Sequence, residues 1–220
     1  MLPNFNLLEF IIIIVPLLIA VIAHEYAHGY VAWRLGDPTA KLAGRLSFNP
    51  VRHLDPVGSF LLPLILKLSG APILFGYARP VPVNFSNLRP LKSGTLWVAS
   101  AGVITNFFLA LISGGIFQIM MAVQPLWQNM LIQPVVLILL KLLAYSVMIN
   151  LVLAIFNLIP IPPLDGGRIV TTLLPPRARE KFRRIEPFGF LIVILLLFTN
   201  FLDLVVAFFI TPLINFLLGM

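Results

Sequence analysis

The sequence predicts an all-α polytopic membrane protein with about four to six transmembrane helices, in a single domain that fills residues 1–220. Of its 220 residues, 60% are hydrophobic and 10% are charged, whereas soluble domains carry about 25% charged residues. The mean hydropathy of +1.02 points the same way. A soluble domain of this length could not bury so much apolar surface, so the lipid bilayer is the expected solvent for most of the chain.

Net charge and cysteine content narrow the possible functions. The formal net charge is +7, which in a soluble protein would suggest a nucleic-acid partner. In a chain this apolar, an excess of Lys and Arg in cytoplasmic loops explains the charge better, and nucleic acid is not an expected partner. The chain contains no Cys, which excludes disulfides, iron–sulfur clusters, thiolate zinc sites and a cysteine nucleophile. Any metal site must therefore use His, Asp, Glu or backbone oxygens.

Long apolar stretches divide the chain into predicted spans. Two central stretches each exceed the ~20 residues that a bilayer requires. The last stretch, the C-terminal hydrophobic segment 188–218, contains polar residues in its middle and is expected to form either one tilted span or two shorter segments. In chain order the stretches are Leu7–Ala23, Val57–Phe75, Leu96–Val123, Val135–Ile159 and Phe188–Leu218.

The second stretch, Val57–Phe75, is interrupted by proline, glycine and lysine, and the loop charges decide its topology. If it crossed the membrane, the basic loop 34–56 and the basic run 177–184 would lie on opposite sides, which the positive-inside rule disfavours. If it dips in and returns, both lie on one side, the cytoplasm. We therefore expect four crossings, an external amino terminus and a re-entrant or short β-hairpin segment near residues 57–85, packed against a cavity.

A metal-ligand pattern, His24-Glu25-Tyr26-Ala27-His28, stands at the end of the first span. On a helix, two histidines four residues apart project from one face. This spacing lets both imidazoles bind one zinc ion while Glu25, on the adjoining face, reaches the zinc-bound water. The alternative is a pair of interfacial histidines satisfied by backbone or lipid headgroups. Ionisable groups at membrane depth are more often functional.

A hydrolytic zinc site requires a third protein ligand and an open position. Asp165 is the strongest candidate, because it follows a turn rich in proline and precedes Gly166 and Gly167. The prolines prevent a regular helix and the glycines allow close backbone approach, so the turn can hold a carboxylate in a fixed direction. Alternatively, Asp165 caps a helix that begins at Gly166. The other candidates are Asp37, Asp55, Asp203, Glu9, Glu180, Glu186 and His53.

These two motifs together, His24-Glu-x-x-His28 and Asn157-x-x-Pro-x-Pro-x-Leu-Asp165-Gly-Gly, resemble the site-2 protease family of zinc intramembrane metalloproteases. Residues 44–58 and 76–84 are similar to its short bacterial branch, which has no PDZ or other appended domain. The resemblance covers residues 15–175. It implies one Zn²⁺ per chain, held by His24, His28 and Asp165, with Glu25 as the catalytic acid/base.

The resemblance also implies a function and a location. The family members are endopeptidases that hydrolyse peptide bonds within or near transmembrane segments of membrane-protein substrates, as part of regulated intramembrane proteolysis. The partners would be a transmembrane protein or peptide and the bilayer. The expected location is a prokaryotic cell membrane, with the basic loops and the active site on the cytoplasmic side.

Four further residues are expected to contact the substrate. By resemblance, Asn157 lines the cleft, and Asn106 ends a family element that begins at Gly102 and here lacks the usual proline. Either asparagine could donate a hydrogen bond to the substrate backbone or to the oxyanion. A transmembrane substrate helix must unwind before hydrolysis. Val81 and Val83 alternate with prolines, a pattern typical of an edge strand, so we expect them to bind the unwound substrate by strand addition.

Two other functional classes compete with the protease. A catalytically silent membrane scaffold would bind partners through the same cavity, but such proteins usually lose a site residue, and here His24, Glu25, His28 and Asp165 are all present. A small metal or ion transporter would use the His/Asp cluster as a translocation site. Transporters tend to contain internal repeats, which this sequence lacks, and they have no evident need for Glu25 between the ligands.

Overall fold

The protein is an all-helical integral membrane protein, as the composition predicts. The computed structural model describes residues 7–53, 55, 61, 65, 79–128, 131–197 and 199–220, and these residues contain no strand. Four helices are long and apolar enough to cross a membrane, within the predicted range. The helices are α1 (Leu7–Arg34), α2 (Thr39–Leu42), η1 (Pro50–Arg52), η3 (Phe85–Asn87), α4 (Leu91–Ala122), α5 (Gln124–Trp127), α6 (Gln133–Asn157), α7 (Asp165–Leu173), α8 (Pro176–Arg183), η4 (Glu186–Phe188), α9 (Gly189–Leu197), α10 (Phe201–Val205), η5 (Val206–Ile210) and α11 (Thr211–Leu218).

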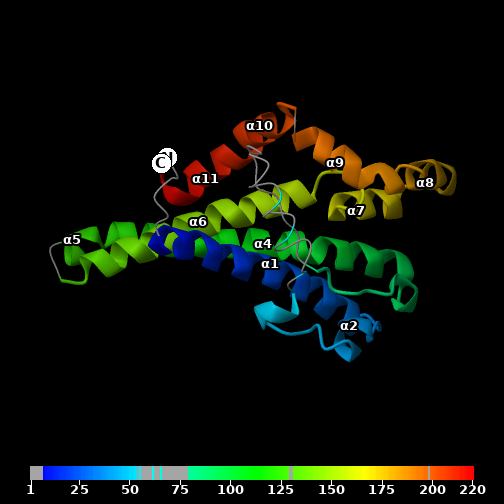
Figure 1. Cartoon of the computed structure of the whole chain (residues 1–220), viewed down its shortest axis with the longest axis horizontal. Coiled ribbons are helices and arrows are strands. Elements are labelled where there is room, and N and C mark those ends of the chain that lie inside the picture. The colour runs from blue at the N-terminus through cyan, green and yellow to red at the C-terminus, as the bar shows by residue number, and fades with distance from the viewer. Residues whose placement is uncertain are drawn as a thin grey trace.

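Three of the four candidate spans form the centre of the molecule. Helices α1, α4 and α6 lie side by side, each in contact with the other two (Figure 1). Small side chains allow this close approach, as is common between helices in lipid. Fully buried alanines occur on all three helices, namely Ala20, Ala32, Ala110 and Ala154. Large apolar residues on the outer faces remain exposed, which suits a lipid environment.

The C-terminal hydrophobic segment forms two shorter pieces, the second of the two predicted alternatives. Helix α9 ends at Leu197, and α10 begins at Phe201 after the non-helical residues Thr199 and Asn200. Figure 1 shows the chain bending between α9 and α10. The stretch Phe201–Leu218 is the fourth candidate span. It packs against α4 and α6 through a buried cluster of Ala110, Val147, Leu151, Ile210 and Leu217.

The predicted re-entrant or hairpin segment near residues 57–85 lies mostly outside the described residues. Its described end, residues 79–84, is irregular, and the edge strand expected around Val81 and Val83 has no paired strand within the described chain. The N–H groups of Val81 and Asn84 instead donate to carboxylates on other elements. Strand addition by this segment therefore stays a prediction.

The helix ends and turns that form the functional site meet at one end of the bundle. Helix α1 ends, α4 begins and α6 ends there, close to α2 and α7 (Figure 1). Basic residues gather in the segments at this end, whereas α5 at the opposite end contains no Lys or Arg. The basic residues of these segments are Arg34, Lys41, Arg45, Arg52, Arg79, Arg89, Lys92, Arg168, Arg177, Arg179, Lys181, Arg183 and Arg184.

Candidate metal centre

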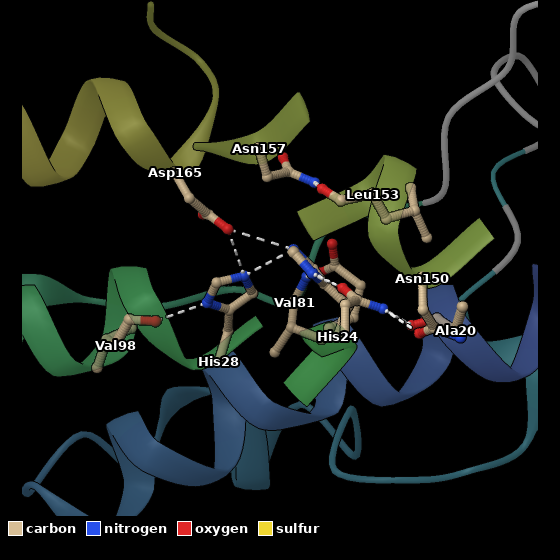
Figure 2. Close-up of polar contacts among 11 residues, drawn as sticks. Ala20, His24, His28, Val81, Val98, Asn150, Leu153, Asn157 and Asp165 are labelled. Atoms are coloured by element: carbon tan, nitrogen blue, oxygen red, sulfur yellow. Dashed lines mark hydrogen bonds and ion pairs between the residues drawn. The ribbon is translucent and has the colours of Figure 1, made fainter. Parts of the chain in front are cut away.

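Two helices bring His24, His28 and Asp165 together. The histidines lie one turn apart on α1, and Asp165 opens α7. The two Nε2 atoms are 3.0 Å apart. The Asp165 Oδ2 atom lies 3.3 Å from Nε2 of His24 and 3.2 Å from Nε2 of His28. Figure 2 shows the three side chains pointing toward one another. The other candidates for the third ligand, six carboxylates and His53, do not join this group, although all lie in the described chain.

The turn between α6 and α7 fixes the direction of Asp165. The N-cap position of α7 is Leu164 and no side chain caps it, so Asp165 is not the helix cap that the sequence left open as an alternative. A Cβ atom on Gly166 would collide with the carbonyl of Leu158, and one on Gly167 would collide with Pro162. Both glycines therefore let α7 pack tightly onto the preceding turn.

A backbone carbonyl determines the tautomer of His28. Its Nδ1 atom lies 2.7 Å from the carbonyl oxygen of Val98 on α4. Because a carbonyl can only accept, Nδ1 of His28 must carry the proton and donate it. The Nε2 atom then presents a lone pair toward His24 and Asp165. This is the arrangement in which a neutral histidine binds a metal.

A chain of side-chain amides determines the tautomer of His24. The Nδ2 group of Asn106 donates to the carbonyl of Ala20 at 3.2 Å and to Oδ1 of Asn150 at 2.7 Å. Asn150 in turn donates to the carbonyl of Ser146 at 2.9 Å. Asn106 must therefore turn its oxygen toward Nδ1 of His24, 2.6 Å away, and that nitrogen donates. Nε2 of His24 again presents a lone pair.

With both imidazoles neutral, these contacts leave three electron-pair donors facing one point with no proton between them. Oδ2 of Asp165 is buried, yet it has no hydrogen-bond donor among the described residues. Three converging lone pairs repel one another unless a cation lies between them. Tetrahedral zinc with bonds of 2.0–2.1 Å separates its ligand atoms by about 3.3 Å, which matches the three separations in this group. The residues present therefore fit a metal ion.

Gly102 on α4 leaves the space that the two imidazoles occupy. A Cβ atom at this position would lie 2.5 Å from Cε1 of His24 and 2.5 Å from Nε2 of His28. Real Cβ atoms do not approach other heavy atoms so closely, so only glycine fits without moving the ligands. From the sequence, Gly102 is known only as the first residue of the family element that ends at Asn106, and its contact with the histidines is not predicted.

Glu25 lies beside the ligand group and faces a cavity of about 290 Å³. Its Oε2 atom accepts a hydrogen bond from the N–H of Val81 at 2.7 Å. The same cavity is lined by Val83, Asn157 and Asp165. A substrate in this cavity would therefore meet the carboxylate of Glu25 and the open side of the metal-ligand group together.

The two asparagines predicted to contact substrate lie in different surroundings. Asn157 lines the cavity, and its Nδ2 group donates to the carbonyl of Leu153 at 2.9 Å, which leaves a second N–H for a ligand. Asn106 is completely buried, at 0% exposure, and its amide contacts His24, Ala20 and Asn150. Asn106 therefore presents no accessible atom to a substrate in this structure.

The chain is similar to known proteins over most of its length. The model of Peptidase family M50 matches residues 12–200. A protein of Bacillus subtilis named "Putative zinc metalloprotease YwhC" is 36% identical over 187 residues, which cover 85% of this chain and 80% of that protein. A protein of Mycolicibacterium smegmatis named "Putative zinc metalloprotease Rip2" is 28% identical over 194 residues, 88% of this chain and 69% of that protein. The Mycobacterium tuberculosis protein of the same name is 28% identical over 189 residues, with shares of 86% and 67%. No solved structure matches the chain.

Proposed function

Since the chain belongs to peptidase family M50, the site-2 protease family, we propose that it is an intramembrane endopeptidase that hydrolyses peptide bonds within or near transmembrane segments. The chain is a site-2-type zinc metalloprotease, and Zn²⁺ is its metal. One observation supports the intramembrane assignment above the others. His24 and His28 lie within α1, a helix long and apolar enough to cross the membrane. We further propose that residues 1–220 act as one domain.

Four residues would carry the reaction. His24, His28 and Asp165 would hold the zinc ion. When bound, zinc lowers the pKa of its water and polarises the scissile carbonyl. Glu25 accepts a proton from the attacking water as the new carbon–oxygen bond forms, and it passes that proton to the leaving amine as the carbon–nitrogen bond breaks. The N–H of Val81 donates a hydrogen bond to Oε2 of Glu25. This bond orients the carboxylate toward the cavity before substrate binds.

Backbone pairing would hold the unwound substrate in the cavity. Val81 and Val83 line it, and among the described residues no acceptor pairs with the N–H of Val83. Pro80 and Pro82 have no N–H, and the N–H groups of Val81 and Asn84 already donate to carboxylates. The N–H of Val83 is therefore the group in this stretch that can pair with an added strand. Asn157 would donate its second N–H to the substrate backbone or to the oxyanion, a contact worth about 2–4 kcal/mol in the transition state.

The charge distribution supports a cytoplasmic active site in a prokaryotic cell membrane. The segments around the metal centre carry most of the basic residues that the structure describes, and α5 at the opposite end of the bundle carries none. Lys and Arg accumulate on the cytoplasmic side of membrane proteins. The substrate would be a transmembrane protein or peptide whose helix reaches this side, cleaved in the course of regulated intramembrane proteolysis.

Cleavage-site mapping in proteoliposomes tests this proposal. The purified protein is reconstituted with a single-span substrate, and the products are identified by mass spectrometry. We expect a cut within or next to the apolar segment, lost when the zinc is chelated. Cleavage restricted to soluble peptides would contradict an intramembrane substrate. Bound zinc with no cleavage of any substrate would support the scaffold instead.

A further inference from the structure

Asp37 is a completely buried carboxylate that the proposed chemistry does not use. It lies just beyond the end of α1 and is 0% exposed. Its two oxygens accept hydrogen bonds from the N–H and Oγ1 of Thr39, at 3.2 and 2.5 Å. They also accept from the N–H of Asn84 at 2.7 Å and from Nδ2 of Asn87 at 2.8 Å. No basic side chain within the described chain forms an ion pair with Asp37.

These hydrogen bonds keep Asp37 charged. Burial acts to raise the pKa of its carboxyl, but the hydrogen bonds from Thr39, Asn87 and Asn84 outweigh burial and lower the pKa below its ordinary value of 3.8. An ionised carboxylate can only accept, so all of its hydrogen-bonding capacity is directed at N–H and O–H groups. Two of its four bonds cross 47 and 50 residues of chain.

The end of α1 aims Asp37 at the segment that follows residue 79. Gly36 has a φ of +104°, which reverses the chain, and the N–H of Asp37 donates to the carbonyl of Ala32 at 2.9 Å. The N–H of Arg89 donates to the carbonyl of Leu35 at 2.9 Å. The helix that carries the histidines and Glu25 is thereby tied at its end to residues 84–89.

A buried cation holds the other end of the same segment. Arg45 is 8% exposed, and its Nη2 donates to the carbonyls of Arg79 at 2.5 Å and Pro80 at 3.4 Å. The N–H of Arg79 donates to the carbonyl of His53 at 2.9 Å. Between the Arg45 contacts and the Asp37 contacts lies Val81, whose N–H meets Glu25.

We propose that Asp37 is a positioning residue for peptide hydrolysis, with Arg45 as its counterpart at the other end. Asp37 holds residues 79–87 (the anchored segment) across the metal centre, so that the N–H of Val81 orients Glu25 and Val83 faces the substrate. Asp37 touches neither the metal ligands nor the substrate, and it acts through the backbone of Asn84. This role rests on the proposed protease function.

The test compares wild type with Asp37→Ala and Asp37→Asn in the full-length reconstituted protein. Asp37→Ala removes all four acceptor contacts. Asp37→Asn keeps one acceptor oxygen, which can still meet the Asn84 N–H. Because a displacement of about 1 Å can cost 100-fold in rate, we expect kcat to fall roughly 10- to 100-fold in Asp37→Ala and less in Asp37→Asn. Asp203→Ala, an exposed carboxylate on α10, is the matched control and is expected to leave kcat unchanged.

Three readouts separate positioning from a general loss of structure. Hydrogen exchange should accelerate at least about tenfold in residues 79–88 of Asp37→Ala and stay unchanged in α4 and α6. Zinc content should stay at the wild-type value. Val81→Pro already removes the N–H that donates to Glu25. Adding Asp37→Ala to Val81→Pro should therefore lower kcat little further, so the two losses should not be additive.

Each other outcome overturns the proposal. Wild-type kcat in Asp37→Ala overturns the positioning role alone, since cleavage itself persists. Loss of zinc, or faster exchange throughout α4 and α6 in both Asp37 variants, would mean that Asp37 supports the whole fold instead. Full additivity with Val81→Pro would mean that Asp37 does not act through Glu25. If the wild-type protein binds zinc but cleaves no substrate, the proposed protease function is contradicted, and the positioning role of Asp37 is contradicted with it.

Discussion

Oδ1 of Asn106 lies 2.6 Å from Nδ1 of His24, in a part of the bundle where Asn106 has no exposed surface. The contact joins α4 to α1, and a second amide, that of Asn150 on α6, joins the third helix to them. The three helices of the core are thus linked to one metal ligand by hydrogen bonds. In lipid, interhelical hydrogen bonds of this kind contribute about 0.6–2 kcal/mol each.

Replacing Asn106 should weaken zinc binding more than it weakens the fold. In Asn106→Ala, His24 loses the acceptor that fixes its tautomer, and such losses typically reduce metal affinity 10- to 100-fold. Zinc affinity is measured by competition with a chelator. Asn157→Ala is the control, because Asn157 bonds to its own helix and not to a ligand. Equal zinc affinity in Asn106→Ala and wild type would contradict this role for Asn106.

Gly102→Ala should remove the metal site through a single methyl group. The added Cβ would meet both imidazoles at 2.5 Å, so the histidines must move away from Asp165. We expect no stoichiometric zinc and no cleavage. Gly115→Ala is the matched control on the same helix, because a Cβ there meets nothing within 4 Å. Helix propensity alone favours alanine by about 0.5–1 kcal/mol at such a position, so Gly115→Ala should be neutral or slightly more stable. Full zinc occupancy in Gly102→Ala would contradict the close packing.

Asp37 should make stability depend on pH in the acidic range. The folded-state pKa of its carboxyl lies below its ordinary value of 3.8. A depressed pKa contributes stability that is fully present above the unfolded-state value and is lost as pH falls through the folded-state value. The difference in melting temperature between wild type and Asp37→Asn should therefore be constant above about pH 5 and shrink below pH 4. A difference that stays constant down to pH 3 would contradict a charged Asp37.

Val83→Pro should reduce cleavage if the substrate pairs with this segment. The substitution removes one N–H and otherwise keeps an apolar side chain. We expect kcat/KM for a transmembrane substrate to fall by about tenfold, the equivalent of one hydrogen bond of about 1.4 kcal/mol. Val83→Ala, which keeps the N–H, should retain most of the wild-type rate. Equal losses in the two variants would point to side-chain packing and not to strand addition.

The spans and the pair of histidine ligands are predictable from the sequence, because both depend on local patterns. Long apolar stretches specify the helices in lipid, and His24 and His28 share one helix, so their spacing determines their geometry. The turn before Asp165 is also local, since its prolines and glycines lie within a few residues. These features require no knowledge of how the helices pack.

The roles of Asn106 and Asp37 depend on contacts between residues that lie far apart in the sequence. Asn106 meets His24 and Asn150 across 82 and 44 residues, and Asp37 meets Asn84 across 47. A sequence shows that an asparagine or aspartate is present, but only helix packing decides whether its side chain meets a substrate or a neighbouring helix. From the sequence alone, Asn106 is therefore predicted to contact substrate, and Asp37 is one of several possible third ligands.

The most direct test of the protease assignment is zinc content and cleavage of a transmembrane substrate, measured together for wild type and Glu25→Gln. Glutamine keeps the shape of the side chain and removes its capacity to accept a proton. We predict about one zinc per chain in both proteins and cleavage by wild type alone. Cleavage by Glu25→Gln at the wild-type rate would contradict the role of Glu25, and the absence of zinc from both proteins would contradict the metal centre itself.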